Sequence, residues 1–298
     1  MPYKLIDCLT NNFQYTASKV AAEYSRTELK IQMSNLAYTT HGDPSLPAVM
    51  LVHGFMSCAG QWWANLDRLS AEYFLVNVEL WGHGSSAEPD DLADYSVTGY
   101  ARAFEAIRIA LQIDRWFVVG QSYGAGVVIN YALQHPRVCR GIVATNSRSA
   151  FGSLNAQSAT DSPFNKPDFS LRQLPYHPIH ARRFPETIKA ELVRCADAMT
   201  VAAIRNGGRL GADLNFRQRL HLIHHPLLLA NGVYEKSFQD DLAVLRTSYP
   251  DLYVVDMPGG HSVNIEAAEE FDAACLRFFY DISRGEIDTY RLNKGQHP

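Results

Sequence analysis

The sequence predicts an α/β protein built on a mostly parallel sheet, with one helical segment inserted into it. Apolar runs of strand length alternate with helical patterns from residue 47 to 146, and again from 225 to 284. Residues 147–224 break this alternation, contain several prolines and include one long helical pattern. We therefore expect an α/β core formed by residues 29–146 and 225–284, with residues 147–224 as a mostly helical cap.

Length and composition are those of a soluble globular protein. The chain has 298 residues, of which 47% are hydrophobic and 19% charged, which is enough apolar material for a sizeable core. A net charge of −4 gives no reason to expect nucleic-acid binding. The N-terminus lacks the basic start and apolar stretch of a signal peptide, and no apolar run reaches the roughly 18 residues of a membrane span. These features favour a cytoplasmic protein.

Cysteine usage also favours a reducing compartment. The five cysteines are odd in number and far apart, and no C-x-x-C pair occurs. A disulfide framework or a zinc site is therefore not expected. The cysteines are Cys8, Cys58, Cys139, Cys195 and Cys275.

The individual elements follow from the apolar periodicity. Residues 1–28 form an N-terminal extension with helical character, ELKIQMSN (28–35) alternates like a strand, and residues 35–47 end in turn signals. The polar tail, 285–298, is expected to be peripheral. Further strands are predicted at 47–54, 73–80, 115–120, 139–146, 225–232 and 251–258. Further helices are predicted at 60–72, 96–113, 124–136, 185–206, 238–248 and 264–282.

The motif that carries the chemistry lies between a strand and a helix. Gly120-Gln121-Ser122-Tyr123-Gly124 matches G-x-S-x-G, the nucleophile elbow, in the context that this motif requires. A strained turn there would raise the Ser122 hydroxyl above the sheet, while the flanking glycines let the strand and the helix approach closely. The helix N-terminus would favour developing negative charge. We therefore predict Ser122 as a nucleophile.

A serine hydroxyl needs a base to remove its proton, and His261 is the candidate. It follows the last predicted strand in DMPGGHSVNIE, late in the chain, where the order nucleophile, acid, histidine places the base. His53 and His83 lie in loops with other tasks. The cluster His221, His224, His225 precedes a strand on the far side of the sheet and is interpreted as a surface loop rather than a metal site.

The acid of the triad is expected on the turn after the strand LLLANG. Glu235 lies there, in Gly232-Val233-Tyr234-Glu235, although Asp is the more usual residue. Asp240 and Asp241 come soon after and could instead be helix N-caps.

Two backbone N–H groups are expected to bind the oxyanion. One belongs to Tyr123, which follows the nucleophile, and the other to Phe55, in the loop after PAVMLV. No metal or organic cofactor is implied. Gly82-His83-Gly84-Ser85-Ser86-Ala87 satisfies the dinucleotide fingerprint formally, but Pro89 and two aspartates follow at once, so no helix opens there to bind a pyrophosphate.

Together these pieces resemble the α/β-hydrolase superfamily over residues 30–282. VHGF resembles its oxyanion loop, GQSYG its elbow, NGVYE its acid turn and GGHS its histidine turn, and ELWGHGSS resembles D-x-x-G-x-G-x-S with Glu79 in place of Asp. The resemblance implies an eight-stranded sheet and a capped serine esterase. Ser122 departs from dehalogenases and epoxide hydrolases, which have Asp there. HGFMSCAGQ lacks the loops of C–C hydrolases, prolyl iminopeptidases and hormone-sensitive-lipase-like esterases.

The substrate is expected to be a small acyl compound bound under the cap. Met56, Trp81 and Arg148 are the candidate contact residues. Residues 148–225 contain eleven Lys and Arg against six Asp and Glu. This basic cap could attract an anionic substrate, or it could complement an acidic core. A homodimer is left open.

The function that these residues favour is hydrolysis of a carboxylic ester, thioester or lactone through an acyl-enzyme. An acyltransferase would use the same acyl-enzyme. A C–C bond hydrolase, or a ligand-binding protein with a vestigial triad, would also be compatible with this fold.

Overall fold

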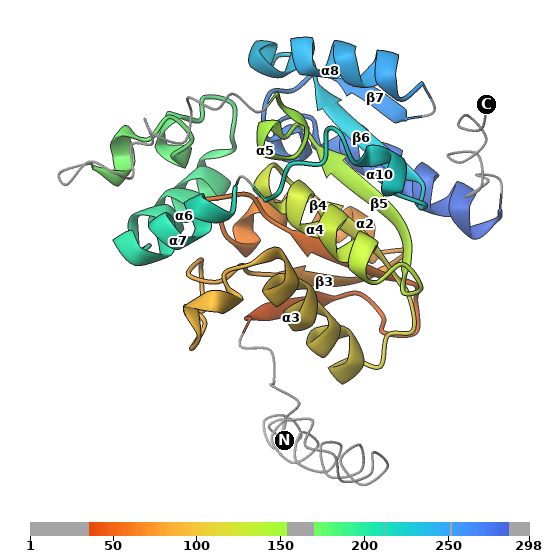
Figure 1. Cartoon of the computed structure of the whole chain (residues 1–298), viewed down its shortest axis with the longest axis horizontal. Helices are drawn as coiled ribbons and strands as arrows, with labels where there is room; N and C mark the ends of the chain where they lie inside the picture. Colours follow the sequence, from red (N-terminus) through yellow and green to blue (C-terminus); the bar gives the residue numbers. More distant parts are fainter. Residues whose placement is uncertain (1–35, 154–169, 212, 251, 286–298) are drawn as a thin grey trace, which may run out of the picture. The chain divides into compact units, whose positions relative to one another are not determined.

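One sheet of seven strands runs through the residues that the computed structural model describes, which are 36–153, 170–211, 213–250 and 252–285 (Figure 1). Its order is β1-β3-β2-β4-β5-β6-β7, and every neighbouring pair is parallel except β1 and β3. The α/β class with a mostly parallel sheet is thereby confirmed. The strands are β1 (Tyr38–His41), β2 (Ala48–Val52), β3 (Phe74–Val78), β4 (Trp116–Gly120), β5 (Cys139–Thr145), β6 (Leu227–Gly232) and β7 (Tyr253–Met257).

The strand count differs from the eight that the resemblance implied, since the described ranges contain seven. The strand expected at 28–35 lies outside these ranges. The edge strand β1 comes instead from residues 35–47, where the sequence showed only turn signals. Its four residues, YTTH, have no apolar alternation. Antiparallel pairing with β3, from Tyr38 opposite Val78 to His41 opposite Leu75, makes this stretch a strand.

Helices cover both faces of the sheet because side chains along each strand alternate between two apolar layers. In β2, Met50 and Val52 join one layer, whereas Val49 and Leu51 join the other. The first layer packs against α3 (Val97–Ala110), α4 (Tyr123–Gln134) and α8 (Lys236–Ser248), and the second against α10 (Ala268–Ser283) and neighbouring short helices. In Figure 1, α3 and α4 lie in front of the sheet. These short helices are η1 (Ala59–Trp62), α2 (Leu66–Ser70) and α9 (Val263–Glu266), whereas η2 (Leu92–Asp94) precedes α3.

The helix predicted at 185–206 is divided into two helices, α6 (Glu186–Asp197) and α7 (Val201–Leu210). Thr200 has extended backbone angles, and its hydroxyl accepts the N–H of Ala203. A side chain that caps backbone donors in this way starts a new helix. The apolar spacing continues across the break, which explains why periodicity alone predicted one helix.

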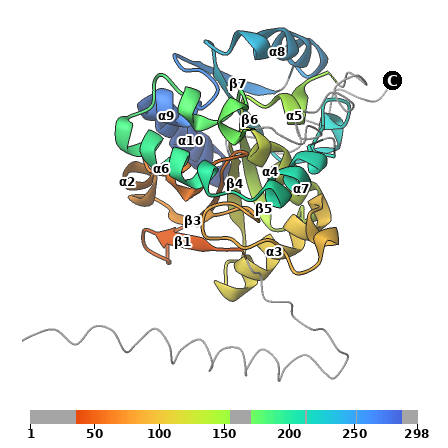
Figure 2. The same ribbon diagram turned by 90° about the vertical axis from the view of Figure 1, so that its left-hand side faces the viewer.

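The inserted segment, residues 147–224, connects β5 to β6. Its described parts form α5 (Arg148–Phe151), η5 (Leu171–Gln173), η6 (Pro178–His180), α6, α7 and η7 (Leu220–Leu222). A Cβ on Gly207 of α7 would lie 2.7 Å from the ring of Phe55. The Tyr123 hydroxyl donates to the Gly207 carbonyl at 3.1 Å. Helix α7 therefore packs closely on the loops at the carboxyl ends of the strands, as Figure 2 shows for α6 and α7.

The basic character of the inserted segment is balanced by carboxylates of the core. Arg183 pairs with Glu266 at 3.2 Å. Arg217 pairs with Asp241, and Arg148 lies 4.0 Å from the same carboxylate. Of the two explanations for the basic cap, these pairs favour charge complementarity with the core.

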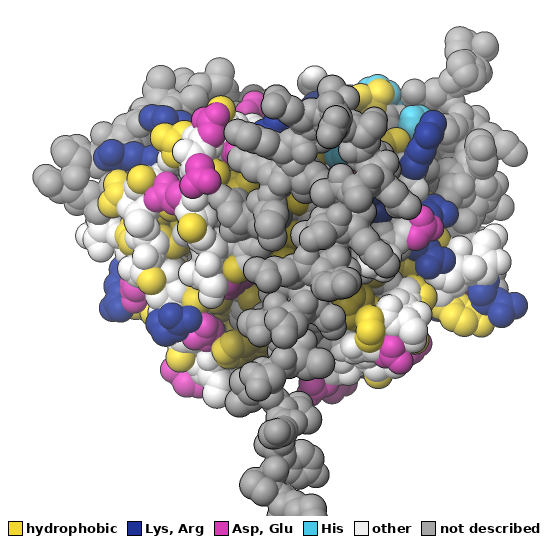
Figure 3. Space-filling model, turned by 90° about the horizontal axis from the view of Figure 1, so that it is seen from below, with side chains coloured by type: hydrophobic (Ala, Val, Ile, Leu, Met, Phe, Trp, Pro, Cys, Tyr) yellow, Lys and Arg dark blue, Asp and Glu magenta, His cyan; other side chains and the backbone are white. Residues whose placement is uncertain are grey.

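Acidic and basic side chains are interspersed over the part of the surface that is coloured in Figure 3. Within the described ranges, no helix combines the length and the apolar character that crossing a membrane requires.

Candidate active site

Ser122 lies in a sharp turn between β4 and α4, with φ 52° and ψ −112°. These angles are strained for any residue except glycine. Glycine is required on both sides of the turn. A Cβ at Gly120 would lie 2.4 Å from the Gly124 carbonyl oxygen, and one at Gly124 would lie 2.5 Å from the carbonyl oxygens of Val52 and His53. The elbow predicted from the sequence is therefore formed, and it carries Ser122 at the N-terminus of α4.

His261 lies between Ser122 and Glu235. Its Nε2 is 2.8 Å from Ser122 Oγ, and its Nδ1 is 2.9 Å from Glu235 Oε1. The carboxylate can only accept, so Nδ1 carries the proton and Nε2 is left to accept the serine proton. The three residues follow β4, β6 and β7, whose carboxyl ends lie at one edge of the sheet. The arrangement can thus transfer a proton from serine to histidine.

The charge on His261 is favoured by its carboxylate neighbours. Desolvation of the ring lowers its pKa, but the hydrogen bond and negative charge of Glu235, with the charge of Glu266, outweigh this effect and raise the pKa above the ordinary 6.5. Glu266 is held in place by the Gly260 N–H at 3.0 Å and by Arg183. An imidazolium at this position is therefore stabilised electrostatically.

The turn that carries Glu235 approaches the histidine turn closely. A Cβ at Gly232 would lie 2.0 Å from the Gly260 carbonyl oxygen, so this approach requires glycine. Glu235 Oε2 is buried, and no donor among the described residues reaches it. The alternative Asp241 instead accepts from Arg217 and from the Ser153 N–H. Of these carboxylates, Glu235 is the one that contacts His261.

Hydrogen bonds from two buried histidines hold the loop that contains Phe55 in place. His53 Nδ1 donates to the Gly54 carbonyl at 2.7 Å, and its Nε2 accepts the Leu80 N–H. His83 Nε2 accepts the Met56 N–H at 3.2 Å. Its Nδ1 donates to the Trp81 carbonyl at 2.9 Å. The loop is therefore tied to the turn after β3.

The two predicted oxyanion donors lie in this region of the fold. Tyr123 is the first residue of α4, so its N–H has no acceptor within the helix. Phe55 lies in the fastened loop, where the next residue, Met56, has a positive φ of 55°. A Cβ at Gly54 would lie 2.1 Å from Gln121 Oε1, so glycine lets this loop approach the elbow. The roles of Phe55 and Tyr123 stay predictions.

Thr145 and Asn146, which the sequence did not single out, also position the site, as does Glu79. Thr145 Oγ1 accepts the Ser122 N–H at 3.0 Å, and Asn146 forms two hydrogen bonds with the backbone of Gly232. Thr145 is the last residue of β5, and Asn146 follows it. Glu79 accepts the N–H groups of Ala59 and Ser85. Each of these residues is polar and lies at or just after the end of a buried strand, and this position is the signal that could have identified it in the sequence.

A cavity of about 480 Å³ lies over Ser122 between the core and the inserted segment. Met56 and Arg148 line it, as predicted. Trp81 is not among its lining residues, because its ring stacks on Tyr100 with centroids 4.4 Å apart inside the core. Apolar groups of the wall include Phe55, Tyr176, Phe184 and Leu192, and polar ones include Gln61, His177 and His180.

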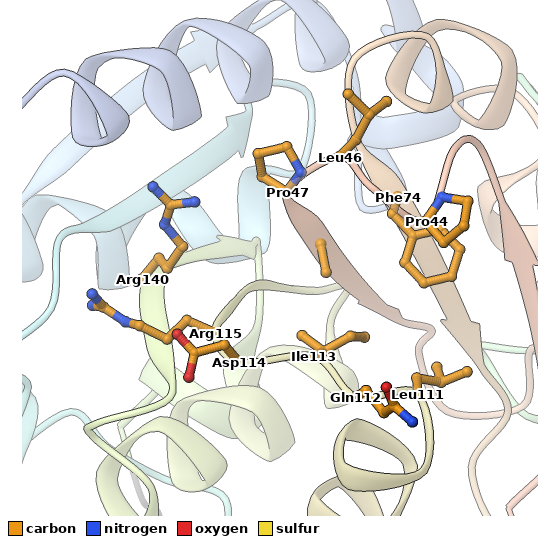
Figure 4. Close-up of a pocket in the computed structure, with 11 residues that line it drawn as sticks. Pro44, Leu46, Pro47, Phe74, Leu111, Gln112, Ile113, Asp114, Arg115 and Arg140 are labelled. Carbon is orange, nitrogen blue, oxygen red and sulfur yellow. The ribbon is translucent and has the colours of Figure 1, made fainter. Parts of the chain in front are cut away.

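A second cavity, of about 430 Å³, lies at the amino ends of the strands, at the opposite edge of the sheet from Ser122 (Figure 4). Its two arginines already have partners. Arg140 lies over the Phe117 ring at 5.0 Å and donates to Ser283 Oγ. Arg115 donates to the Cys139 carbonyl at 3.4 Å. Both arginines therefore have structural contacts within the protein.

Residues 47–186 match a family model described as alpha/beta hydrolase fold. RutD from Shigella flexneri, which bears the name of a carbamate hydrolase, is 27% identical over 83% of this chain and 95% of its own. A hydrolase from Pseudomonas aeruginosa PA01 superposes with a TM-score of 0.70 at 21% identity, covering 82% of this chain and 94% of that one. A thermophilic esterase from Thermogutta terrifontis superposes at 0.68 and 18% identity, covering 83% and 93%. Together with the sheet topology, these likenesses show that the chain has the α/β-hydrolase fold.

Proposed function

We propose that this protein is a serine hydrolase that cleaves a carboxylic ester, thioester or lactone through a covalent acyl-enzyme. One observation carries the proposal: Ser122 Oγ, the His261 ring and the Glu235 carboxylate form a continuous hydrogen-bonded row, with separations of 2.8 Å and 2.9 Å. In this row each group has the chemical partner that its role requires.

The reaction follows from the direction of these hydrogen bonds. His261 Nε2 takes the proton of Ser122 as the serine oxygen attacks the substrate carbonyl. Glu235 stabilises the imidazolium, and the N–H groups of Phe55 and Tyr123 bind the oxyanion. His261 then gives its proton to the leaving alcohol or thiol, which leaves an acyl-Ser122. A water molecule deprotonated by His261 attacks this acyl group, and the acid product departs with Ser122 regenerated.

We also propose that the inserted segment, 147–224, acts as a cap that selects the acyl group. Aromatic and aliphatic side chains from the core and from this segment form much of the cavity wall, including Phe55, Phe184 and Leu192. A cavity of about 480 Å³ suits a small apolar or aromatic ester. Arg148 at its margin is already near Asp241, so we do not assign it the recognition of an anionic substrate.

The test is covalent labelling with a fluorophosphonate probe, combined with turnover of short-chain p-nitrophenyl esters. The wild-type protein is expected to be labelled at Ser122, as located by peptide mass spectrometry, and to hydrolyse the ester. The Ser122→Ala variant is expected to lose both properties, whereas the Ser70→Ala control, on α2 and not in the cavity wall, keeps both. Label on another residue, or full turnover by Ser122→Ala, would contradict the proposal.

Carbamate cleavage is a second candidate, because relatives such as RutD bear the name of a carbamate hydrolase and align over 83% of this chain. Attack on a carbamate would produce a carbamoyl-Ser122, which resonance from nitrogen makes slower to hydrolyse than an acyl ester. The two candidates separate on matched p-nitrophenyl ester and carbamate substrates with the same side group. A higher kcat/KM for the carbamate would select this second candidate.

A further inference from the structure

Two buried cysteines face each other across the contact between the core and the inserted segment. Cys58 precedes η1, shortly after the loop that contains Phe55, and Cys195 lies in the last turn of α6. They are 1% and 3% exposed. Their sulfur atoms and the nearest oxygen of the Glu191 carboxylate all lie within 4.8 Å of one another. The fold thus places two thiols close together although they are far apart in the sequence.

Helix α6 can approach η1 this closely because Gly60 has no side chain. A Cβ at Gly60 would lie 3.1 Å from Glu191 Cγ and 3.6 Å from Cys58 Sγ. The cysteine pair also lies inside an apolar cluster with Ile188 and Leu192 of α6. The thiols are therefore held next to each other by packing on all sides.

The hydrogen bonds around the pair give the two sulfurs different roles. The hydrogen bond to Cys195, together with burial, raises the pKa of the Cys58 thiol well above its usual range. Cys195 instead donates to Glu191 Oε1 at 3.5 Å, and its sulfur accepts from the Arg194 guanidinium at 3.4 Å. The Cys195 sulfur thus lies between a carboxylate that accepts its S–H and a guanidinium that donates to it. We therefore assign the first step to Cys195.

We propose that Cys58 and Cys195 are a redox-active pair whose oxidation to a disulfide ties the inserted segment to the loop beside the active site. The oxidant is a peroxide. The Cys195 sulfur attacks one peroxide oxygen; the O–O bond breaks, the sulfur becomes a sulfenic acid, and the departing hydroxide takes the thiol proton to form water. Cys58 sulfur then attacks Cys195 sulfur, and the sulfenic hydroxide leaves with the Cys58 proton as a second water. Two thiols are oxidised, and one peroxide is reduced to two waters.

The surrounding charges favour this chemistry over metal binding. Glu191 already accepts from both Arg194 nitrogens, Nε at 2.8 Å and Nη2 at 2.6 Å. A metal ion bound by the two sulfurs and this carboxylate would lie against the guanidinium cation. A disulfide needs only the sulfurs to close to about 2 Å, and it leaves the Glu191–Arg194 pair intact.

The disulfide would fix one wall of the active-site cavity. Leu192 lies one turn before Cys195 on α6, and Met56 lies two residues before Cys58; both line that cavity. With the two elements tied together, the inserted segment can no longer separate from the core at this point. If the chain is the hydrolase proposed above, substrate entry would slow on oxidation and recover on reduction.

The experiment treats the full-length protein with stepwise hydrogen peroxide and maps its peptides without reduction. We expect a peptide pair linked through Cys58 and Cys195, lost on treatment with dithiothreitol, and a reversible rise in the thermal unfolding midpoint. Cys58→Ser and Cys195→Ser should form no link, and the Cys139→Ala control should form the same link as the wild type.

Two outcomes would overturn the proposal. One is the absence of the linked peptide in wild-type protein that circular dichroism shows to be folded, after a peroxide excess that fully oxidises a methionine-containing reference peptide in the same sample. The other is stoichiometric zinc binding that protects both thiols from peroxide and that Cys195→Ser abolishes. Because peptide mapping does not depend on turnover, neither outcome is confused with a failure of the proposed hydrolase activity.

Discussion

His53 and His83 differ from His261 in almost every physical respect, although all three lie at the same edge of the sheet. The first two are buried and form hydrogen bonds with backbone groups, and burial lowers their pKa values to about 4 and about 3. The side chain of His261 is 45% exposed and bonds to a carboxylate, and its pKa is raised. Burial thus favours the neutral ring in His53 and His83, whereas the carboxylate partner favours the charged ring in His261.

This difference separates a structural use of histidine from a chemical one. A neutral ring with one donor and one acceptor nitrogen can join two loops, as long as it never titrates. A ring that must gain and lose a proton needs a partner that stabilises the charged form and an open side for the substrate. Each histidine can be tested separately, because the described contacts of the two groups do not overlap.

The largest effect is expected from His261→Ala. Without the base, Ser122 keeps its proton, so ester turnover should fall by about three to four orders of magnitude. The free energy of unfolding should change little, because the imidazole is half-exposed. His221→Ala, exposed on η7, is the matched control and should keep wild-type kcat/KM. If His261→Ala retained a tenth of the activity, His261 would not be the base.

Glu235→Gln tests the carboxylate that makes His261 different from the other two. The neutral ring is the working base, so the raised pKa places the acid limb of the kcat/KM profile above pH 6.5. Removing the negative charge lowers this pKa, and the acid limb should move to lower pH while the maximal rate falls about 10²–10⁴-fold. A pH–rate profile from 5 to 9 measures both changes. An unmoved acid limb would show that another group controls it.

His83→Gln tests the structural group. Its folded pKa lies below the ordinary 6.5, so the unfolded chain binds protons first, and stability present at neutral pH is lost as pH falls from about 6.5 towards about 3. We expect the variant to lose about 1–3 kcal/mol at pH 7, because a Gln amide cannot place its acceptor and its donor where the two ring nitrogens lie, so the Met56 N–H or the Trp81 carbonyl loses its partner. Its further loss between pH 7 and pH 5 should be smaller than that of the wild type, measured by urea denaturation. His221→Gln should follow the wild-type curve, and equal acid sensitivity in His83→Gln would refute this account.

The smallest effect is expected for Asp272→Asn, which applies the same comparison to a buried carboxyl group. Burial raises the pKa of Asp272 to about 7, despite a hydrogen bond from Asn65 at 2.8 Å. Between about pH 4 and pH 7 the folded state retains a proton that the unfolded chain releases, so stability falls as pH rises through this range. Asp272→Asn should therefore gain about 1–2 kcal/mol at pH 8 and little at pH 4, as denaturant titrations would show. A gain of equal size at both pH values would rule out titration as its cause.

Much of the core and of the proposed triad could be predicted from the sequence. The strands from β2 to β7 are continuous apolar runs next to turn signals, and Ser122, Glu235 and His261 each follow one of them in the order that the elbow motif requires. Such signals are local, so a single sequence contains them. The strand β1 could not be found in this way, because its pairing with β3 rather than its own residues makes it a strand.

The residues that support the site depend on contacts across long separations in sequence. Nothing near His83 indicates that its ring accepts the Met56 N–H, and nothing near Cys58 indicates Cys195. Trp81 was expected at the cavity because it follows a strand, but its stacking on Tyr100 depends on where α3 packs. Scattered cysteines and histidines therefore acquire their roles only from the fold.

The strained backbone of Ser122 sets the stability of the protein against the presence of a serine at this position. Its φ of 52° and ψ of −112° suit glycine, so Ser122→Gly should unfold with a free energy about 1 kcal/mol higher than the wild type while losing all turnover. If stability were the only property under selection, glycine would therefore be favoured over serine at position 122. Serine at this position therefore lowers the stability of the protein relative to glycine. Equal or lower stability of the glycine variant would refute this view.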